Sequence, residues 1–178
     1  PKDWTNFENY IRAFTEGNML TGFKNTIIIL TTSLIGTTLI GTMVAFVLDR
    51  FKFKGSKLII NLFLLAALVP GVTTQIATFQ IVNALGLFNS LWAAIVLYLG
   101  TDIIAVYIFI QFMRSIPVSL DESAMLDGAS YFTIYRKIIM PLLKPAIVTV
   151  FIIKGVNVYN DFYTPFLYMP KRDLMTIS

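Results

Sequence analysis

Two long stretches of this chain contain no charged residue, and they limit what the chain can fold into. Residues 25–48 form the first stretch and residues 58–101 the second. A helix of about 24 residues is ~36 Å long, enough to cross a hydrocarbon core of ~30 Å. The first stretch therefore predicts one membrane span. The second is too long for a single crossing, and the Asn, Gly and Ser residues at 83–90 predict a break in it, which gives spans at about 58–82 and 91–112.

A further span is expected at about 145–169, after a polar segment at 113–144 that contains prolines near both ends. Within the span at 58–82, Pro70 is expected to bend the helix, because proline lacks the backbone donor and clashes with the preceding turn. The predicted fold class is therefore an all-α membrane protein, a polytopic helical bundle with about four spans in this chain.

The composition supports this class and excludes several kinds of chemistry. Hydrophobic residues make up 56% of the chain and charged residues 13%, against about 25% charged in a soluble domain. The chain contains no Cys and no His, which excludes disulfides, thiol chemistry, His acid–base catalysis and Cys/His metal sites. We expect no catalytic residue, no metal and no cofactor. No Walker A pattern occurs, so an ATP site is expected only on another chain.

Basic residues occur in short clusters between the apolar stretches, which indicates membrane topology and argues against nucleic acid as a partner. The loop at 83–90 has no Lys or Arg, whereas the other two loops have several: Arg50, Lys52, Lys54 and Lys57 in the first, and Arg114, Arg136, Lys137 and Lys144 in the third. Basic loops remain in the cytoplasm. Residues 49–57 and 113–144 are thus predicted to be cytoplasmic and residues 83–90 extracytoplasmic, in a multi-pass protein of the cell (inner) membrane surrounded by lipid.

This topology places both ends of the chain outside the cell. Residues 1–24 contain apolar residues at helical spacing, namely Trp4, Phe7, Tyr10, Ile11 and Phe14. They predict a short amphipathic helix at the outer membrane surface, with an ordinary extramembrane helix as the alternative. Residues 25–169 are expected to form the membrane domain, and residues 170–178 to begin an extracytoplasmic loop.

The predicted cytoplasmic segment at 113–144 has the signals of two short helices. Ser119 and Glu122 have the spacing of a capping box, and Gly128 is a plausible residue of positive φ at the end of the first helix. Ser130 can cap a second helix over 131–139, and Pro141 precedes the last span. The two helices carry more apolar residues than a free loop needs, which predicts a docking partner.

The same segment resembles a known family. Glu122-Ser123-Ala124, then Gly128, then Ile138-x-Met140-Pro141 is similar to the E-A-A-x3-G-x9-I-x-L-P signature of ABC importer permeases, with Ser123 in place of the first Ala and Met140 in place of Leu. Further matches, which resemble the sugar-type (maltose-permease-like) branch, include F-K-F-K-G at 51–55, L-G-L-F-N-S at 85–90, D-G-A-S at 127–130 and Y-N-D-F at 159–162. The resemblance extends over essentially the whole chain.

The resemblance implies a permease subunit that forms part of the path for a sugar or oligosaccharide. Its implied partners are a second permease subunit, two ATPase subunits and an extracytoplasmic solute-binding protein. It also implies about six spans, with one before Pro1 and one after Ser178, and no ATP hydrolysis by this chain. The implied ATPase-coupling residues are Glu122, Ser123, Ala124, Asp127, Gly128, Ile138 and Pro141.

Charged residues within the predicted spans are the candidates for the translocation path. Asp102, Lys154 and Asp161 would each cost roughly 2.5–3.5 kcal/mol facing lipid at mid-depth, so they are expected to face protein or a water-filled path. Asn157 lies about one helical turn from Lys154 and from Asp161, which predicts a polar stripe with Tyr159 and Asn160 beside it. A structural cluster between helices is the alternative. A weaker candidate is the patch of Thr74, Gln75 and Thr78 beside Pro70.

Two contacts between spans can also be predicted. Lys154 lies ~15 Å into the membrane from one side and Asp102 ~16 Å from the other, so in a core of ~30 Å they are expected to pair or to share a polar cavity. Ser33, Thr37, Gly41 and Ala45 repeat every four residues, and small residues at this spacing allow another helix to approach closely.

Other classes of function fit less well. An intramembrane enzyme would need a catalytic pair, and the chain has no His and only two Asp residues at different estimated depths in its spans. A passive membrane channel or an assembly scaffold without an ATPase partner remains the alternative, although neither explains the two-helix segment at 113–144.

Overall fold

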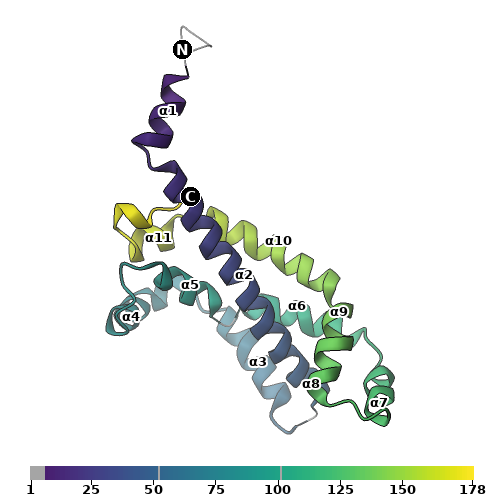
Figure 1. Ribbon diagram of the computed structural model, residues 1–178. Coiled ribbons are helices and arrows are strands. Elements are labelled where there is room, and N and C mark those ends of the chain that lie inside the picture. Colours follow the sequence, from purple (N-terminus) through teal and green to yellow (C-terminus); the bar gives the residue numbers. More distant parts are fainter. Residues whose placement is uncertain (1–6, 52, 101) are drawn as a thin grey trace.

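The computed structural model describes residues 7–51, 53–100 and 102–178, and every regular element in these ranges is a helix. The long helix α2 (Met19–Arg50) runs through the molecule, and α1 (Glu8–Thr15) extends beyond its first end (Figure 1). The predicted residues Trp4 and Lys52 lie outside the described ranges. Helix α1 lies within the segment predicted to be amphipathic, and Phe7 before it and Tyr10 and Ile11 on it are exposed.

The remaining helices follow α2 in two groups. The first group is α3 (Ser56–Ala67), α4 (Gly71–Ala84), α5 (Leu91–Leu99) and α6 (Ile103–Arg114). The second contains α7 (Val118–Leu126), α8 (Tyr131–Ile134), the π-helix η1 (Tyr135–Ile139), α9 (Met140–Leu142), α10 (Lys144–Asn160), α11 (Tyr163–Tyr168) and the 3-10 helix η2 (Arg172–Leu174). In Figure 1, α7 and α8 lie at one end of the molecule, and α4 and α11 at the other.

By length and composition, α2 and the segment Leu91–Arg114 are suited to cross a membrane, and a third candidate is the pair Tyr131–Leu142 and Lys144–Asn160, bent by 69°. The single span predicted at 58–82 is instead divided into two helices, α3 and α4. Pro70 has an extended ψ of 129° and separates α3 from α4, so the proline ends one helix instead of bending a continuous one. At ~18 and ~21 Å, these two helices are each shorter than a ~30 Å core.

Small residues place α2 against α6, as their spacing predicts. Ser33, Thr37, Gly41 and Ala45 are all buried, and α2 packs more extensively against α6 than against any other helix in the described ranges. A Cβ atom on Gly41 would lie 3.0 Å from Cε2 of Phe109. Glycine at this position therefore permits the close approach of the two helices.

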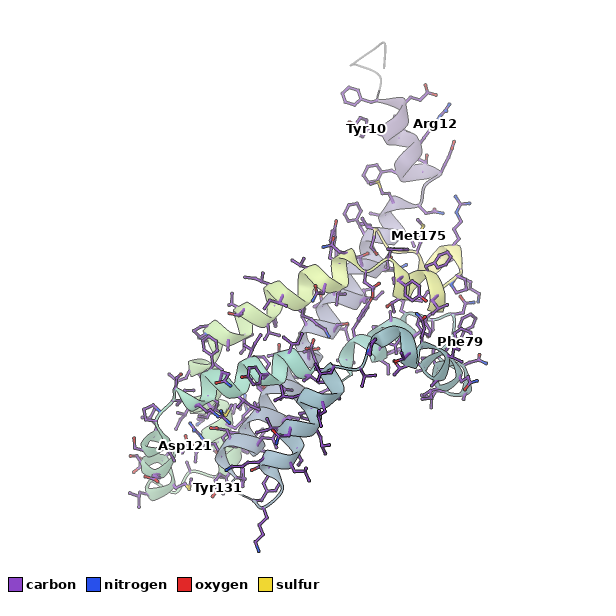
Figure 2. All side chains as sticks on the ribbon, turned by 180° about the vertical axis from the view of Figure 1, so that it is seen from behind. Tyr10, Arg12, Phe79, Asp121, Tyr131 and Met175 are labelled. Carbon is purple, nitrogen blue, oxygen red and sulfur yellow. The ribbon has the colours of Figure 1, made fainter. Side chains whose placement is uncertain are left out.

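Two apolar clusters hold the helices together, one toward each end. The first joins α2 and α6 to the segment that follows α7, with Phe109, Met113, Ile134 and Ile139 fully buried. The second includes Ile29, Ala93, Ala94 and Ile95 and lies toward α11. Figure 2 labels residues from the two ends, with Asp121 and Tyr131 at one end and Phe79 and Met175 toward the other.

Candidate functional site

The segment α7–α8 forms a helix, a glycine turn and a second helix, with α8 beside the end of α2 (Figure 1). Gly128 has a φ of +82°, as predicted. Its amide donates to the carbonyl of Met125 at 3.0 Å, and the amide of Ala129 donates to that of Ala124 at 2.9 Å. This pair of bonds is a Schellman motif, which fixes the direction of the chain after α7.

Of the two helix caps predicted in this unit, one is present and the other is absent. Ser130 caps α8, because its Oγ accepts a hydrogen bond from the amide of Thr133 at 3.3 Å. The capping box of Ser119 and Glu122 is wrong, since α7 already begins at Val118 with Pro117 at the N-cap position and no side-chain cap. Pro117 has a φ of −59° and a ψ of 133°, so the chain turns into the helix before Ser119 is reached.

The residues of the family signature fall into two sets. Glu122, Ser123, Asp127, Gly128 and Pro141 are exposed on the surface of the segment. Ala124 and Ile138 instead pack against the apolar cluster that contains Phe109 and Ile139. One set is thus available for contact with another molecule, and the other attaches the segment to the membrane helices.

A buried ion cluster that sequence reasoning missed connects the same segment to α2. Arg50, the last residue of α2, contacts Asp121 of α7 with 2.6 Å between Nε and Oδ2. Its Nη2 also donates to the carbonyl of Ile116 at 3.0 Å, and its Nη1 contacts Asp49 at 3.0 Å. From the sequence, Arg50 was identified only as a basic residue of a predicted cytoplasmic loop. The further signal in the sequence is Asp121, an acidic residue in a helix that was predicted on the same side.

The predicted contact between Asp102 and Lys154 is present. Lys154 Nζ lies 2.8 Å from Asp102 Oδ2, and the two side chains are 13% and 19% exposed. Asp102 is also the N-cap of α6, since its Oδ1 accepts from the amide of Ala105 at 3.0 Å. A cavity of about 30 Å³ lies beside the pair, with Asn157 in its lining. The pair therefore neutralises two charges between α6 and α10.

The predicted polar stripe does not extend to Asp161. Helix α10 ends at Asn160, and Asp161 has an extended ψ of 100°. Its carboxylate accepts hydrogen bonds from Tyr98 OH at 2.9 Å and Thr164 Oγ1 at 2.6 Å, and from the amides of Tyr163 and Thr164. Because these donors turn Asp161 toward α5 and the start of α11, it stabilises a break in the chain and does not continue the face of Lys154 and Asn157.

The other candidate path residues lie in separate places. Tyr159 and Asn160 line an apolar groove between α2 and α10 that also includes Leu30 and Leu34. Gln75 donates to Tyr163 OH, and both line an open cavity of about 620 Å³ with Thr78. Of the predicted path residues, the structure thus brings together only Asp102, Lys154 and Asn157.

Comparisons with known proteins agree with this architecture. The family model described as "Binding-protein-dependent transport system inner membrane component" matches residues 37–174. The galactooligosaccharides transport system permease protein GanQ of Bacillus subtilis is 43% identical over 64% of this chain and 40% of its own length. The diacetylchitobiose uptake system permease protein NgcG of Streptomyces coelicolor is 30% identical over 100% of this chain and 59% of its own length.

A solved structure shows the same fold. In the bacterial ABC transporter involved in import of the acidic polysaccharide alginate, a chain matches with a TM-score of 0.86 and 19% identity, over 96% of this chain and 60% of that one. This chain therefore spans about 40–60% of the length of the relatives it matches. From the family match and the apolar helices, we conclude that the chain is a multi-pass membrane protein and belongs to the family of inner membrane components of binding-protein-dependent transport systems.

Proposed function

We propose that the chain is the membrane-spanning permease subunit of an ATP-driven importer, and that it forms part of the path for a sugar or oligosaccharide. The names of its relatives GanQ and NgcG specify uptake of oligosaccharides. In this proposal an extracytoplasmic binding protein delivers the sugar, a second permease subunit completes the path, and two separate ATPase subunits bind and hydrolyse ATP.

The observation that carries the proposal is the surface of the α7–α8 unit. Leu126 is 90% exposed and Phe132 64% exposed, and Leu120 and Met125 are also exposed. Large apolar side chains grouped on one small, well-fixed unit are typical of a protein interface. Because the Schellman turn and the packing of Ala124 and Ile138 fix this unit, a partner that moves it would also move the helices to which it is attached.

The orientation of the proposed subunit follows from its basic residues. Lys54 lies in the loop after α2, Lys57 lies in the first turn of α3, and Arg136 and Lys137 lie in the segment after α8. By the positive-inside rule, the α7–α8 end is in the cytoplasm in this proposal. The ATPase subunits are on that side in the proposal, and α1, α4 and α11 face the binding protein or the outer membrane surface.

The path itself is proposed to run beside α10. Asp102 and Lys154 neutralise each other, so this part of the path has no net charge, which is compatible with passage of an uncharged sugar. Asn157 is exposed beside the pair, and its amide can exchange hydrogen bonds with sugar hydroxyl groups. Asp161 is excluded from this role, since its carboxylate is occupied by donors from the chain itself.

Co-purification and uptake together test the proposal. The tagged subunit, expressed together with its neighbouring genes, is expected to co-purify with an ATPase when the membranes are solubilised in a mild detergent. Cells that contain it are expected to take up at least one oligosaccharide from a panel of maltotriose, raffinose, galactobiose and arabinobiose, with uptake abolished by ATP depletion. Uptake that persists without ATP and without a bound ATPase would favour the passive channel instead.

A further inference from the structure

The guanidinium group of Arg50, at the end of α2, contacts a segment that is distant in sequence, residues 116–121. It contacts Asp121 in α7, the carbonyl of Ile116 in the loop before α7, and Asp49 in α2. Asp49 in turn lies 3.6 Å from Nε of Arg114, the last residue of α6. The ends of α2 and α6 and the side of α7 thus meet in one ion cluster.

Burial makes this cluster sensitive to the loss of any one charge. The side chains of Arg50 and Asp121 are 7% and 4% exposed. The second oxygen of Asp121, Oδ1, is buried and has no hydrogen-bond partner among the described residues, so Arg50 supplies the compensation for this carboxylate. A buried charge that loses its partner is strongly unfavourable, and α7 would have to shift to bring Asp121 to water.

The cluster also links α7 to α2 where apolar packing is sparse. Helix α7 contacts mainly α8, and Ala124 is its residue that packs against the apolar cluster. Asp121 lies three residues before Ala124 and so on the same face of α7. Its contact with Arg50 is an ion pair between buried groups, with 2.6 Å between Nε and Oδ2, and neither Nε of Arg50 nor Oδ1 of Asp121 has a hydrogen-bond partner among the described residues. Apolar contact at Ala124 attaches α7 at one point, and the ion pair adds a second point on the same face, which restricts the orientation of the helix.

We propose that Arg50 is a positioning residue for energy coupling: it holds α7 in a fixed orientation against the end of α2, so that a displacement of α7 is passed to α2 and to the α2–α6 pair. This inference rests on the proposed function, in which an ATPase subunit moves α7. It assigns to α2 a direct connection to α7, in addition to the packing of Tyr131 of α8 against Phe51 at the end of α2 and to the covalent connections of α7 to α6 and of α8 to α10.

The test measures movement at the far end of the molecule without requiring the substrate. Thr78 lines the open cavity near α11, and a single cysteine at this position can be labelled with a membrane-impermeant maleimide because the chain has no Cys of its own. In the complex with its ATPase, ATP with vanadate is expected to change the rate of labelling of the T78C chain. In the R50M, T78C chain this change is expected to fall by roughly fivefold or more, while the ATPase remains bound.

Two further variants separate positioning from general structure. Arg50→Lys keeps a charge for Asp121 and is expected to restore part of the nucleotide-dependent change. Lys54→Gln removes an exposed basic residue at the same end and is expected to leave the change as it is. If R50M does not insert into the membrane, Asp121→Asn, which removes the charge but keeps the shape, decides the question in the same assay.

The possible results are distinct. A full nucleotide-dependent change in R50M or D121N overturns the inference. Loss of the bound ATPase in both variants also overturns it, because Arg50 would then only stabilise the docking surface. The proposed function itself fails if the T78C chain without further substitutions binds no ATPase or shows no change with ATP and vanadate.

Discussion

Two ion pairs among the described residues, Arg50–Asp121 and Asp102–Lys154, differ in what surrounds them. Arg50 and Asp121 are 7% and 4% exposed and belong to a cluster that joins α2, α6 and α7. Lys154 and Asp102 are 13% and 19% exposed and lie beside a cavity of about 30 Å³. The first pair is enclosed and shares its charges with neighbours, so it holds helices in one arrangement. The second is a single contact with space next to it, which is compatible with rearrangement along a path.

The largest effect on stability is expected when one charge of the Arg50–Asp121 pair is removed. Arg50→Met is expected to lower the free energy of unfolding by about 3–5 kcal/mol, because the buried carboxylate of Asp121 then either lacks its partner or must be exposed by a shift of α7. The double variant R50M, D121L replaces the pair by apolar side chains and is expected to recover most of this loss. Denaturant unfolding in detergent measures both values. An R50M chain as stable as the unsubstituted chain would show that the pair is not the constraint described here.

The second pair is expected to give a smaller but measurable coupling. In a double-mutant cycle with Asp102→Asn and Lys154→Met, the interaction energy is expected to be about 0.5–3 kcal/mol. Asp102→Asn combined with Arg136→Gln, an exposed residue at the α8 end, is the control and should be additive. If the effects of the two substitutions on stability are additive, Asp102 and Lys154 do not interact, and the difference described between the two ion pairs does not hold.

The contrast between the pairs also shows what sequence can reveal. Asp102 and Lys154 could be matched because each lies inside an apolar stretch, where a charge needs a partner and depth can be estimated from helical rise. Arg50 and Asp121 lie outside such stretches, where charges are common and solvent is an adequate partner. Nothing in their local sequences distinguishes them from Lys54 or Glu122, and their contact depends on how α7 folds back onto α2.

Local signals predicted the turn of the α7–α8 unit better than its start. Gly128 has a positive φ, which the absence of a Cβ atom permits, and the hydroxyl group of Ser130 caps α8. The residue types were therefore sufficient to predict both features. The start of α7 was misplaced because Pro117 sets the entry of the chain before Ser119. The end of α10 was also misplaced, since Asp161 is drawn out of the helix by Tyr98 and Thr164, and Tyr98 lies in another helix.

The turn itself allows a test of how rigid the docking unit must be. Gly128 has a φ of +82° with no atom within 4 Å of an added Cβ, so substitution there changes the backbone preference without a steric clash inside the chain. Gly128→Val is expected to cost about 1–2 kcal/mol and to weaken ATPase retention. Gly128→Asn, which tolerates positive φ, is the matched control and should retain more ATPase. Equal retention by both variants would show that the turn is not a rigid connector.

The smallest effect on stability is expected at the exposed signature residue of α7. Glu122 is exposed and has no capping role, so Glu122→Lys should change the free energy of unfolding by only about 0.5 kcal/mol or less. Its expected effect is on ATPase association, which should weaken because the charge on the docking surface is reversed. A stability loss as large as that of R50M would place Glu122 in the structural cluster and not on the contact surface.

Cross-linking from two matched leucines tests the central claim most directly. Leu126 is 90% exposed on the α7–α8 unit, and Leu85 is 64% exposed near the opposite end, after α4. Each is replaced by cysteine in a chain that has no other, and a bifunctional reagent with one thiol-reactive and one amine-reactive group is added to the assembled complex. The account predicts that L126C cross-links to the ATPase subunit and that L85C does not. A cross-link to the ATPase from L85C and none from L126C would contradict both the docking surface and the proposed orientation.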